Sequence, residues 1–263
     1  MSTDKPVPGE LEKPVSFLPY DQFILFGDSI TEFSCNQEQG FGFHPALQNA
    51  YSRRLDVVNR GFRGYNTAHA IKVLPKFFPA PQIVRVRLMT IFFGANDAVL
   101  PGFAQHIPLE KYKENLKAII THPATVAQAP KILLLTAPPI NEYQLVGFDA
   151  QKGFTTPSRT AQNTKLYADA CREVGASLGV PVVDIWTAFM KAAGWQEGQP
   201  LVGSKDLPNS DVLSNLLSDG LHFTPEGYKI MYNEVIKVIR TAYPDQDPEK
   251  LPMVFPGWEQ APK

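Results

Sequence analysis

The stretch QFILFGDSIT, residues 22–31, decides the fold class, because it joins a strand to a helix through a short polar turn. Residues 22–26 are almost wholly apolar, which is typical of a strand buried on both faces of a parallel sheet. The turn Gly27-Asp28-Ser29 follows directly. In open parallel sheets, ligands bind outside the carboxyl ends of the strands. We therefore expect Ser29 to lie at a binding edge.

Four more short apolar runs follow the first, and amphipathic segments separate them. The predicted strands are residues 22–26, 56–59, 88–93, 131–137 and 180–184. Apolar residues recur at helical spacing from Leu109 and around Tyr167, the latter behind a start at Pro157-Ser158, and Thr224 is expected to cap the last helix. This alternation predicts an α/β fold of three layers, α/β/α, with a central parallel five-stranded sheet.

One domain over residues 1–243 is expected, because the chain shows no internal repeat and no low-complexity linker. Two stretches, 138–157 and 194–218, look irregular, and long irregular connections in compact domains are often functional. Residues 244–263 are rich in proline and still carry apolar side chains. We expect this C-terminal arm to pack on the surface of the domain.

The charge and composition argue against several partners. The 263 residues carry a formal net charge of −1, which creates no long-range field for nucleic acid or an anionic membrane surface. No apolar run is long enough to span a bilayer. The first residues lack a basic segment followed by an apolar one, so we expect no signal peptide and a cytoplasmic protein. A homodimer remains open.

The two cysteines, Cys35 and Cys171, form no metal-binding pattern with each other or with histidine. Their number suits a reducing compartment, although one disulfide remains open. The cysteine pattern therefore gives no reason to expect a metal or a cofactor, and the low net charge favours a small neutral molecule as the substrate.

A serine nucleophile with its base is one interpretation of Ser29 and the segment DGLH at 219–222. An aspartate three residues before a histidine on a tight turn can bind one ring nitrogen of that histidine, which frees the other to take a proton from a serine. Each motif alone also has a simpler interpretation. Ser29 could cap a helix, and Asp219 could cap a turn that leaves His222 at the surface.

Two middle segments contain donors that such a serine would need. The sequence NRGFRG at 59–64 follows the second predicted strand, and GAND at 94–97 follows the third. A tetrahedral intermediate requires hydrogen-bond donors directed at its negative oxygen. The Gly64 amide, the Asn96 side chain and the Ser29 amide are candidates, although glycine and asparagine are also common in turns.

Taken together and in this order, the four motifs resemble the four blocks of the SGNH hydrolases, the GDSL family, over about residues 23–239. Within that family, GDSIT, NRGFRGYN and DGLHF are similar to the isoamyl-acetate-hydrolysing esterases. The resemblance implies a flavodoxin-like fold and cofactor-free hydrolysis of short-chain, acetate-type esters. It also implies a nucleophilic Ser29, a triad completed by Asp219 and His222, and an oxyanion hole of Ser29, Gly64 and Asn96.

Residues within or beside these motifs are expected to contact the substrate, namely Asp28, Phe33, Arg63 and Phe223. Aromatic residues at such places are also typical of a hydrophobic core. If they narrow the acyl side of the site, acetyl to butyryl chains are preferred over octanoyl and longer chains.

A second serine motif, GASLG at 175–179, matches the G-x-S-x-G elbow of other hydrolases. That elbow requires a strand before the serine and a helix after it, whereas here a helix is expected before and a strand after. We therefore interpret Ser177 as a loop residue and Gly179 as a helix C-cap.

Three alternative functions use the same residues or the same fold. An acyltransferase would pass the acyl group to an alcohol or sugar, and a lipase or thioesterase would accept longer acyl groups. A non-catalytic binding protein would keep the fold alone, and the complete set of Ser, Gly, Asn, Asp and His argues against it.

Overall fold

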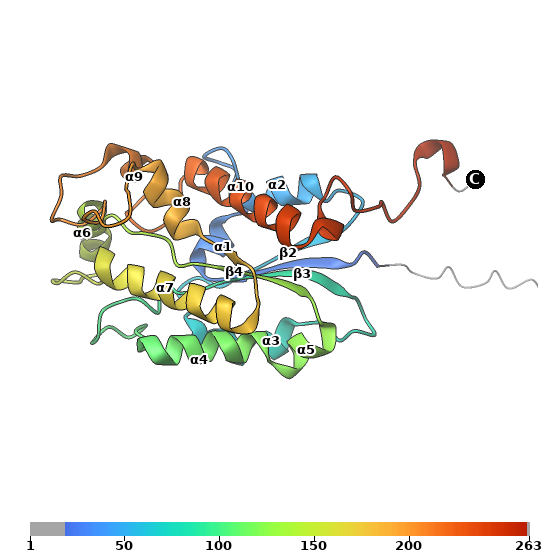
Figure 1. The fold of residues 1–263 in the computed structure, drawn as a ribbon, viewed down its shortest axis with the longest axis horizontal. Helices are drawn as coiled ribbons and strands as arrows, with labels where there is room; N and C mark the ends of the chain where they lie inside the picture. Colours follow the sequence, from blue (N-terminus) through green and yellow to red (C-terminus); the bar gives the residue numbers. More distant parts are fainter. Residues whose placement is uncertain (1–18, 262–263) are drawn as a thin grey trace, which may run out of the picture.

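A central sheet of five parallel strands organises the computed structural model, which describes residues 19–261. Its strand order, β2-β1-β3-β4-β5, is that of the flavodoxin-like doubly wound fold, so the predicted fold class is confirmed (Figure 1). The strands are β1 (Gln22–Gly27), β2 (Asp56–Gly61), β3 (Val86–Phe92), β4 (Lys131–Leu135) and β5 (Val182–Val183).

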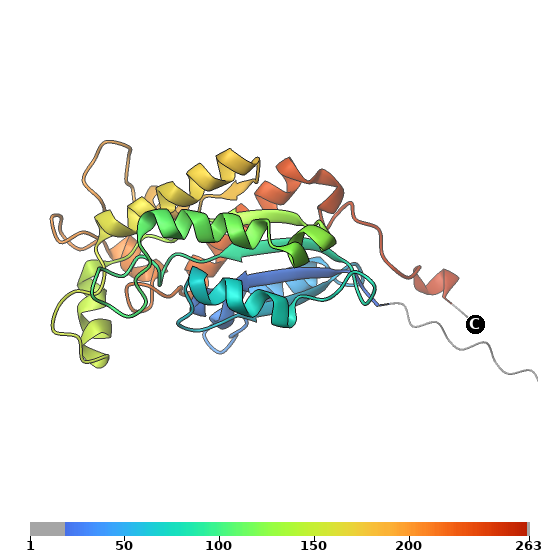
Figure 2. The same cartoon turned by 90° about the horizontal axis from the view of Figure 1, so that it is seen from below.

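Alternate residues of the strands build two separate cores. Phe23 and Leu25 of β1 belong to one cluster, whereas Ile24 and Phe26 belong to the other, because successive side chains of a strand point to opposite faces. Figures 1 and 2 show the helices in two layers that cover these faces. The first layer contains α2 (Phe43–Ala50), α8 (Ile185–Ala192) and α10 (Pro225–Ala242); the second contains α3 (Thr67–Phe77), α4 (Leu109–Ile120) and α7 (Ala161–Leu178).

The register of the three central strands determines where the motifs meet. Gly27, the last residue of β1, lies opposite Gly61 of β2 and opposite Phe92 of β3. The segments that follow these three strands therefore leave the sheet side by side, at the edge where such folds bind ligands.

The remaining elements of residues 19–261 are the helices α1 (Ser29–Phe33), α5 (Pro123–Gln128), α6 (Glu142–Gln151) and α9 (Asp211–Leu216) and the short 3-10 helices η1 (Pro244–Gln246) and η2 (Trp258–Gln260). The prediction that 138–157 and 194–218 lack regular structure is wrong for α6 and α9. Neither helix was predicted from the sequence, because each is short and buries few side chains. Helix α6, for example, buries only Leu145 and Asp149. Helix α7 begins at Ala161 with Thr160 as its N-cap, a few residues later than expected.

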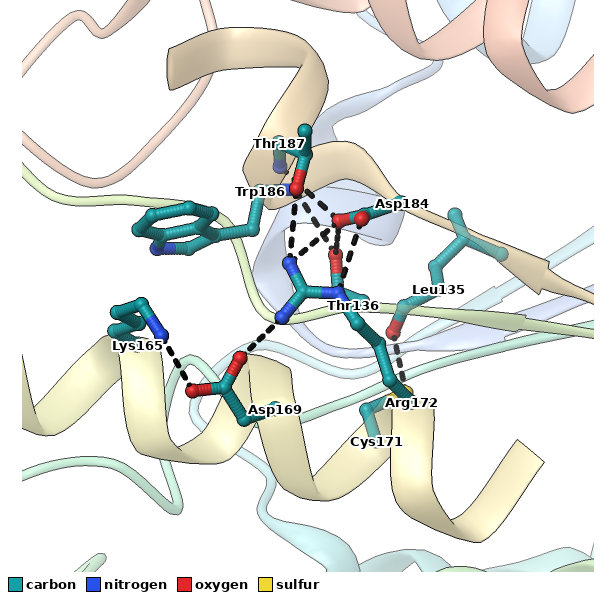
Figure 3. A network of polar contacts seen from close by, with 9 residues as sticks. All are labelled: Leu135, Thr136, Lys165, Asp169, Cys171, Arg172, Asp184, Trp186 and Thr187. Carbon is teal, nitrogen blue, oxygen red and sulfur yellow. Dashed lines mark hydrogen bonds and ion pairs between the residues drawn. The ribbon is translucent and has the colours of Figure 1, made fainter. Parts of the chain in front are cut away.

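The sheet edge at β5 is held by a polar network between α7 and α8 (Figure 3). The Arg172 guanidinium donates from Nε and Nη2 to the two carboxylate oxygens of Asp184, at 2.9 and 2.8 Å, and pairs with Asp169 on its own helix. Asp184 in turn caps α8 by accepting from the Thr187 amide. Because β5 is only two residues long, these bonds and the packing of Trp186 fix this edge in place of a long strand.

The chain after Tyr243 divides into a packed part and an exposed part. The Tyr51 hydroxyl donates to the Gln246 carbonyl at 2.8 Å, and Leu251 is buried in the first core. Beyond it, the Phe255 side chain is 43% exposed and Trp258 is 84% exposed. The predicted C-terminal arm thus packs over its first residues, and its end extends away from the sheet (Figure 1).

No helix of the part of the chain that the structure describes is both long enough and apolar enough to cross a membrane.

Candidate active site

Ser29 is the first residue of α1, directly beyond the carboxyl end of β1. The Asp28 side chain caps this helix by accepting from the Ile30 amide at 2.9 Å. The turn is tight enough to require glycine before it, because a Cβ on Gly27 would lie 2.0 Å from the Thr31 hydroxyl and 2.8 Å from the Phe92 carbonyl. The sequence Gly-Asp-Ser therefore sets the serine on a rigid elbow at the edge of the sheet.

Ser29, His222 and Asp219 form a continuous hydrogen-bonded chain. The Ser29 Oγ lies 2.9 Å from His222 Nε2, and His222 Nδ1 lies 2.7 Å from Asp219 Oδ2. Burial opposes ionisation of Asp219, but hydrogen bonds from the His222 ring and from the Leu221 and His222 amides hold its pKa below the ordinary value. The ionised carboxylate can fix the histidine with its proton on Nδ1, which leaves Nε2 free to accept the serine proton.

The loop that carries His222 is braced from two sides. A bridge joins Leu217 to Phe223, and the Ser218 amide donates to the His222 carbonyl at 2.8 Å. Gly220 lies in the left-handed region (φ +87°), and its carbonyl accepts from the Asn141 amide at the start of α6. After the loop, Tyr228 of α10 donates to the carbonyl of Ile30 at 2.7 Å. This last bond links the histidine segment to the helix that carries the serine.

Gly64 and Asn96 follow the ends of β2 and β3, and both lie beside Ser29. Gly64 has a φ of +79°, which favours glycine, and Asn96 is almost fully buried. The Asn96 Nδ2 donates to the Tyr65 carbonyl at 2.9 Å, which leaves its second N–H for another acceptor. Within residues 19–261 the amides of Ser29 and Gly64 donate to no protein group. Three N–H donors are therefore available around Ser29.

A cavity of about 320 Å³ opens over Ser29. It brings together the predicted nucleophile, all three residues of the predicted oxyanion hole and two of the four predicted substrate-binding residues, Phe33 and Arg63. The full lining is Ser29, Phe33, Arg63, Gly64, Asn96, Gln105, Phe148, Lys152, Asp219, Leu221 and His222.

The other two residues predicted to bind substrate lie elsewhere. The Asp28 side chain is buried beneath α1 and bonded to the Ile30 amide, and it does not line this cavity. Phe223 packs in the first core, with its ring centroid 4.6 Å from that of Phe189. It borders a neighbouring cavity of about 240 Å³, which shares Phe33, Asp219 and His222 with the first. Phe223 therefore lies beyond the histidine and not over the serine.

Two aromatic rings flank His222, and a positively charged side chain lies over each ring. The Phe33 and Phe148 centroids lie 5.2 and 5.7 Å from that of His222, both edge to face. The Arg63 guanidinium lies 4.4 Å from the Phe33 centroid, and Lys152 Nζ lies 4.0 Å from that of Phe148. Apolar rings thus shield the histidine from water, and two cations, Lys152 and the Arg63 that also pairs with Glu32, line the same cavity.

Sequence reasoning missed the contributions of Gln105, Phe148 and Lys152 as individual residues. Phe148 and Lys152 come from α6 and the residue after it, inside a stretch whose length suggested a functional loop. Gln105 donates to the Gly64 carbonyl at 2.7 Å and so supports one of the candidate oxyanion donors. No sequence signal marked it, because the bond spans 41 residues of chain.

The second serine motif, GASLG at 175–179, does not form a strand-to-helix turn like the one that carries Ser29. Ser177 lies in the last turn of α7 and donates to the Val174 carbonyl at 2.9 Å, so its interpretation as a loop residue is wrong. Gly179 is the C-cap, in the left-handed region (φ +64°), as predicted. A helix ends and a strand begins at this motif, which is the reverse of a nucleophile elbow.

Both cysteines are free, Cys35 exposed and Cys171 buried. Among residues 19–261, no group of three or more His, Cys, Asp or Glu side chains is placed to hold a metal ion.

Comparisons of the sequence and of the fold with known proteins all find esterases, lipases or acylhydrolases. Residues 25–230 match the model of the GDSL-like lipase/acylhydrolase family. A GDSL esterase/lipase of Arabidopsis thaliana is 36% identical over 89% of this chain and 91% of its own. The isoamyl acetate-hydrolyzing esterase of Saccharomyces cerevisiae is 32% identical over 92% of this chain and 95% of its own. The crystal structure of a lipase/acylhydrolase from Enterococcus faecalis superposes with a TM-score of 0.58 at 25% identity, covering 84% of this chain and 96% of that one.

The plant relative is more similar in sequence than the yeast esterase, so the comparisons support the family as a whole and do not single out its isoamyl acetate group. The matched segment contains Ser29, Gly64, Asn96, Asp219 and His222, the residues that meet at the cavity. On this evidence the chain belongs to the GDSL-like lipase/acylhydrolase family, also known as the SGNH hydrolases, and is an esterase.

Proposed function

We propose that this esterase hydrolyses short-chain, acetate-type carboxylic esters through an acyl-enzyme on Ser29. The observation that carries the proposal is the chain from Ser29 Oγ to His222 Nε2 (2.9 Å) and from His222 Nδ1 to Asp219 Oδ2 (2.7 Å). These distances allow His222 to remove the serine proton while Asp219 stabilises the resulting imidazolium.

In the first half of the reaction, Ser29 Oγ attacks the ester carbonyl carbon as its proton passes to His222 Nε2. The carbonyl oxygen becomes negative, and the amides of Ser29 and Gly64 and the free N–H of Asn96 are the donors available to it. The intermediate then collapses, the bond to the alcohol oxygen breaks, and His222 returns its proton to that oxygen. The alcohol leaves and the acyl group remains on Ser29.

In the second half, a water molecule takes the place of the alcohol. His222 removes a proton from it, the hydroxide oxygen adds to the acyl carbon, and the same donors stabilise the second intermediate. Collapse breaks the bond to Ser29 Oγ, which recovers its proton from His222. The products are an alcohol and a carboxylic acid.

The size of the cavity supports a short acyl group. A volume of about 320 Å³ is near the small end for ligand sites, and it must hold both the acyl group and the reacting carbonyl. The rings of Phe33 and Phe148 narrow it on the side of His222. The yeast relative named for isoamyl acetate adds support for acetate esters.

A series of p-nitrophenyl esters from acetyl to dodecanoyl tests the proposal. Each methylene that the cavity buries contributes about 0.8 kcal/mol of binding, whereas each one that does not fit displaces the carbonyl from its donors. We expect kcat/KM to be highest for acetyl to butyryl esters and to fall from octanoyl on. Values that rise through dodecanoyl would identify a lipase with a long acyl groove. Ester products formed from added alcohols faster than free acid would identify an acyltransferase.

A further inference from the structure

A buried arginine lies directly behind Asn96. Arg159 precedes α7 and is only 3% exposed, although it carries a charge. Its Nε donates to the Ala95 carbonyl at 2.8 Å, and its Nη2 donates to Asn96 Oδ1 at 3.3 Å. It does not line the cavity over Ser29, and the cavity residue to which it donates a hydrogen bond is Asn96. Burying an arginine side chain has a high desolvation cost, which singles out this residue for explanation.

The bond to Arg159 decides which way the Asn96 carboxamide faces. An arginine can only donate, so the asparagine atom next to it must be the oxygen. The Nδ2 group then faces the Tyr65 carbonyl, 2.9 Å away, and its second N–H is free for the cavity. With the amide reversed, the guanidinium would face an NH₂ group and the Tyr65 carbonyl would face an oxygen. Two contacts would become repulsive, and the cavity would lose a donor.

We propose that Arg159 is a positioning residue of the ester hydrolysis, which holds the Asn96 carboxamide with its N–H toward the oxyanion and places a buried positive charge behind it. The inference rests on the proposed role of Asn96 as an oxyanion donor. A cation that donates to Oδ1 also polarises the carboxamide and makes its N–H a stronger donor.

Arg159 is itself held by a second layer of bonds. Its Nη1 donates to the Ser158 hydroxyl at 3.1 Å, and that hydroxyl donates to Asp149 Oδ1 at 2.6 Å. The Ser158 amide donates to Asp149 Oδ2 at 2.8 Å. Asp149 belongs to α6, the helix that also carries Phe148 to the side of His222. One helix therefore supports both the histidine and, through Arg159, the asparagine.

The segment around Arg159 also braces the loop that carries Asn96. The Leu100 amide donates to the Ser158 carbonyl at 2.8 Å, and Asn163 Nδ2 donates to the Ala98 carbonyl at 2.7 Å. Burial lowers the pKa of Arg159 to about 10, with Asp149 opposing the shift, so the guanidinium remains charged at neutral pH. The arginine thus contributes its charge under ordinary assay conditions.

The first experiment compares Arg159→Met with Arg172→Met in the full-length chain. Arg172 is the matched control, because it also donates two hydrogen bonds, in its case to Asp184. These bonds stabilise the sheet edge at β5 and involve no residue that lines the cavity over Ser29 (Figure 3). With p-nitrophenyl acetate, we expect Arg159→Met to lower kcat by about 10- to 100-fold with little change in KM, because a misplaced donor affects mainly the transition state. Arg172→Met should lower the melting temperature and leave kcat within about twofold of the wild type.

The second experiment is a double-mutant cycle with Asn96→Ala. If Arg159 acts through Asn96, adding Arg159→Met to Asn96→Ala should lower kcat by less than about threefold more. A full additional loss would show that Arg159 acts on kcat independently of Asn96 and would overturn the inference. So would a folded Arg159→Met enzyme with the kcat of the wild type.

If Arg159→Met does not fold, Arg159→Lys replaces it in the same double-mutant cycle, and its kcat tests whether Arg159 positions Asn96. Lysine keeps the charge but cannot reach two acceptors from one rigid fork. We expect a kcat between those of the wild type and Asn96→Ala, and equality with the wild type would overturn the inference. Ser29→Ala, measured in parallel, keeps the two proposals apart: if it is inactive while the Arg159 variants are unaffected, the inference fails and the acyl-enzyme proposal stands.

Discussion

The Ser29 hydroxyl oxygen and His222 Nε2 lie 2.9 Å apart, although 193 residues of chain separate them. Ser29 begins α1, and His222 lies just before α10, which is tied to α1 by the bond from Tyr228 to the Ile30 carbonyl. The distance between the two reacting atoms therefore depends on how α1 and α10 pack against each other.

The nucleophile is tested by Ser29→Ala. The variant should fold, because the alanine methyl fits where the serine lay and Asp28 still caps α1. Ester hydrolysis should fall by several orders of magnitude, since the bond that forms the acyl-enzyme is lost. Turnover of p-nitrophenyl acetate by purified protein measures this. Ser177→Ala is the matched control and should leave turnover unchanged; more than a few per cent of activity in Ser29→Ala would refute the assignment.

The role of Asn96 predicts a particular split of the kinetic constants. Asn96→Ala removes a donor that acts mainly in the transition state, so kcat should fall by roughly 10²–10³-fold while KM changes little. Steady-state kinetics with an acetate ester provide the measurement. A raised KM with unchanged kcat would instead make Asn96 a residue that binds the ground state of the substrate.

The ring of Phe33 predicts a change of acyl-chain preference. It borders both the cavity over Ser29 and the neighbouring cavity beside Phe223. Phe33→Ala should join the two spaces and raise the ratio of kcat/KM for octanoyl over acetyl esters by about tenfold, because methylenes excluded before can then be buried. Phe255→Ala, in the exposed part of the C-terminal arm, is the control. An unchanged ratio in Phe33→Ala would show that another group limits the chain.

The buried Asp28 predicts a dependence of stability on pH. Burial raises its pKa from 3.8 to about 7; the Ile30 amide and Arg159 oppose the shift, and Asp97 adds to it. Since the folded pKa lies above the unfolded one, this contribution to stability is complete below about pH 4 and is lost as the pH rises through 7. Asp28→Asn keeps an oxygen for the Ile30 amide and does not titrate.

The free energy of unfolding in urea, measured from about pH 4 to pH 8, tests this dependence. The Asp28→Asn protein should gain stability relative to the wild type up to about pH 7, by on the order of a few kcal/mol, and the difference should then level off. Asp56→Asn changes an exposed carboxylate and is the control. Parallel curves for the wild type and Asp28→Asn would contradict the raised pKa.

The division of the C-terminal arm predicts two different effects on stability. Leu251 lies in the first core, so Leu251→Ala should lower the free energy of unfolding by about 2–5 kcal/mol. Deletion of residues 257–263 leaves the bonds of Arg53 to Val254, Phe255 and Pro256 in place, removes the exposed Trp258, and should cost less than about 1 kcal/mol. Urea unfolding of both proteins makes the comparison. A larger loss from the deletion would mean that the end of the arm packs on the domain.

The strands and the long helices were predictable because their signals are local. A buried parallel strand needs a short apolar run, and the capped start of α10 at Thr224-Pro225 is recognisable without any knowledge of its neighbours. Helix α6 has no such signal, since it buries only two side chains and depends on contacts with the loop that carries His222.

What the sequence by itself determined were the chemical groups: a serine after a strand, an aspartate three residues before a histidine, and a glycine and an asparagine after two neighbouring strands. These follow from short motifs, whose geometry depends on residues close in the chain. Only the tertiary structure decided that Asp28 and Phe223 turn away from the cavity over Ser29, and that Phe148 and Arg159 support His222 and Asn96. The physical reason is that these contacts join elements far apart in sequence, and packing of the layers alone determines which side chains meet.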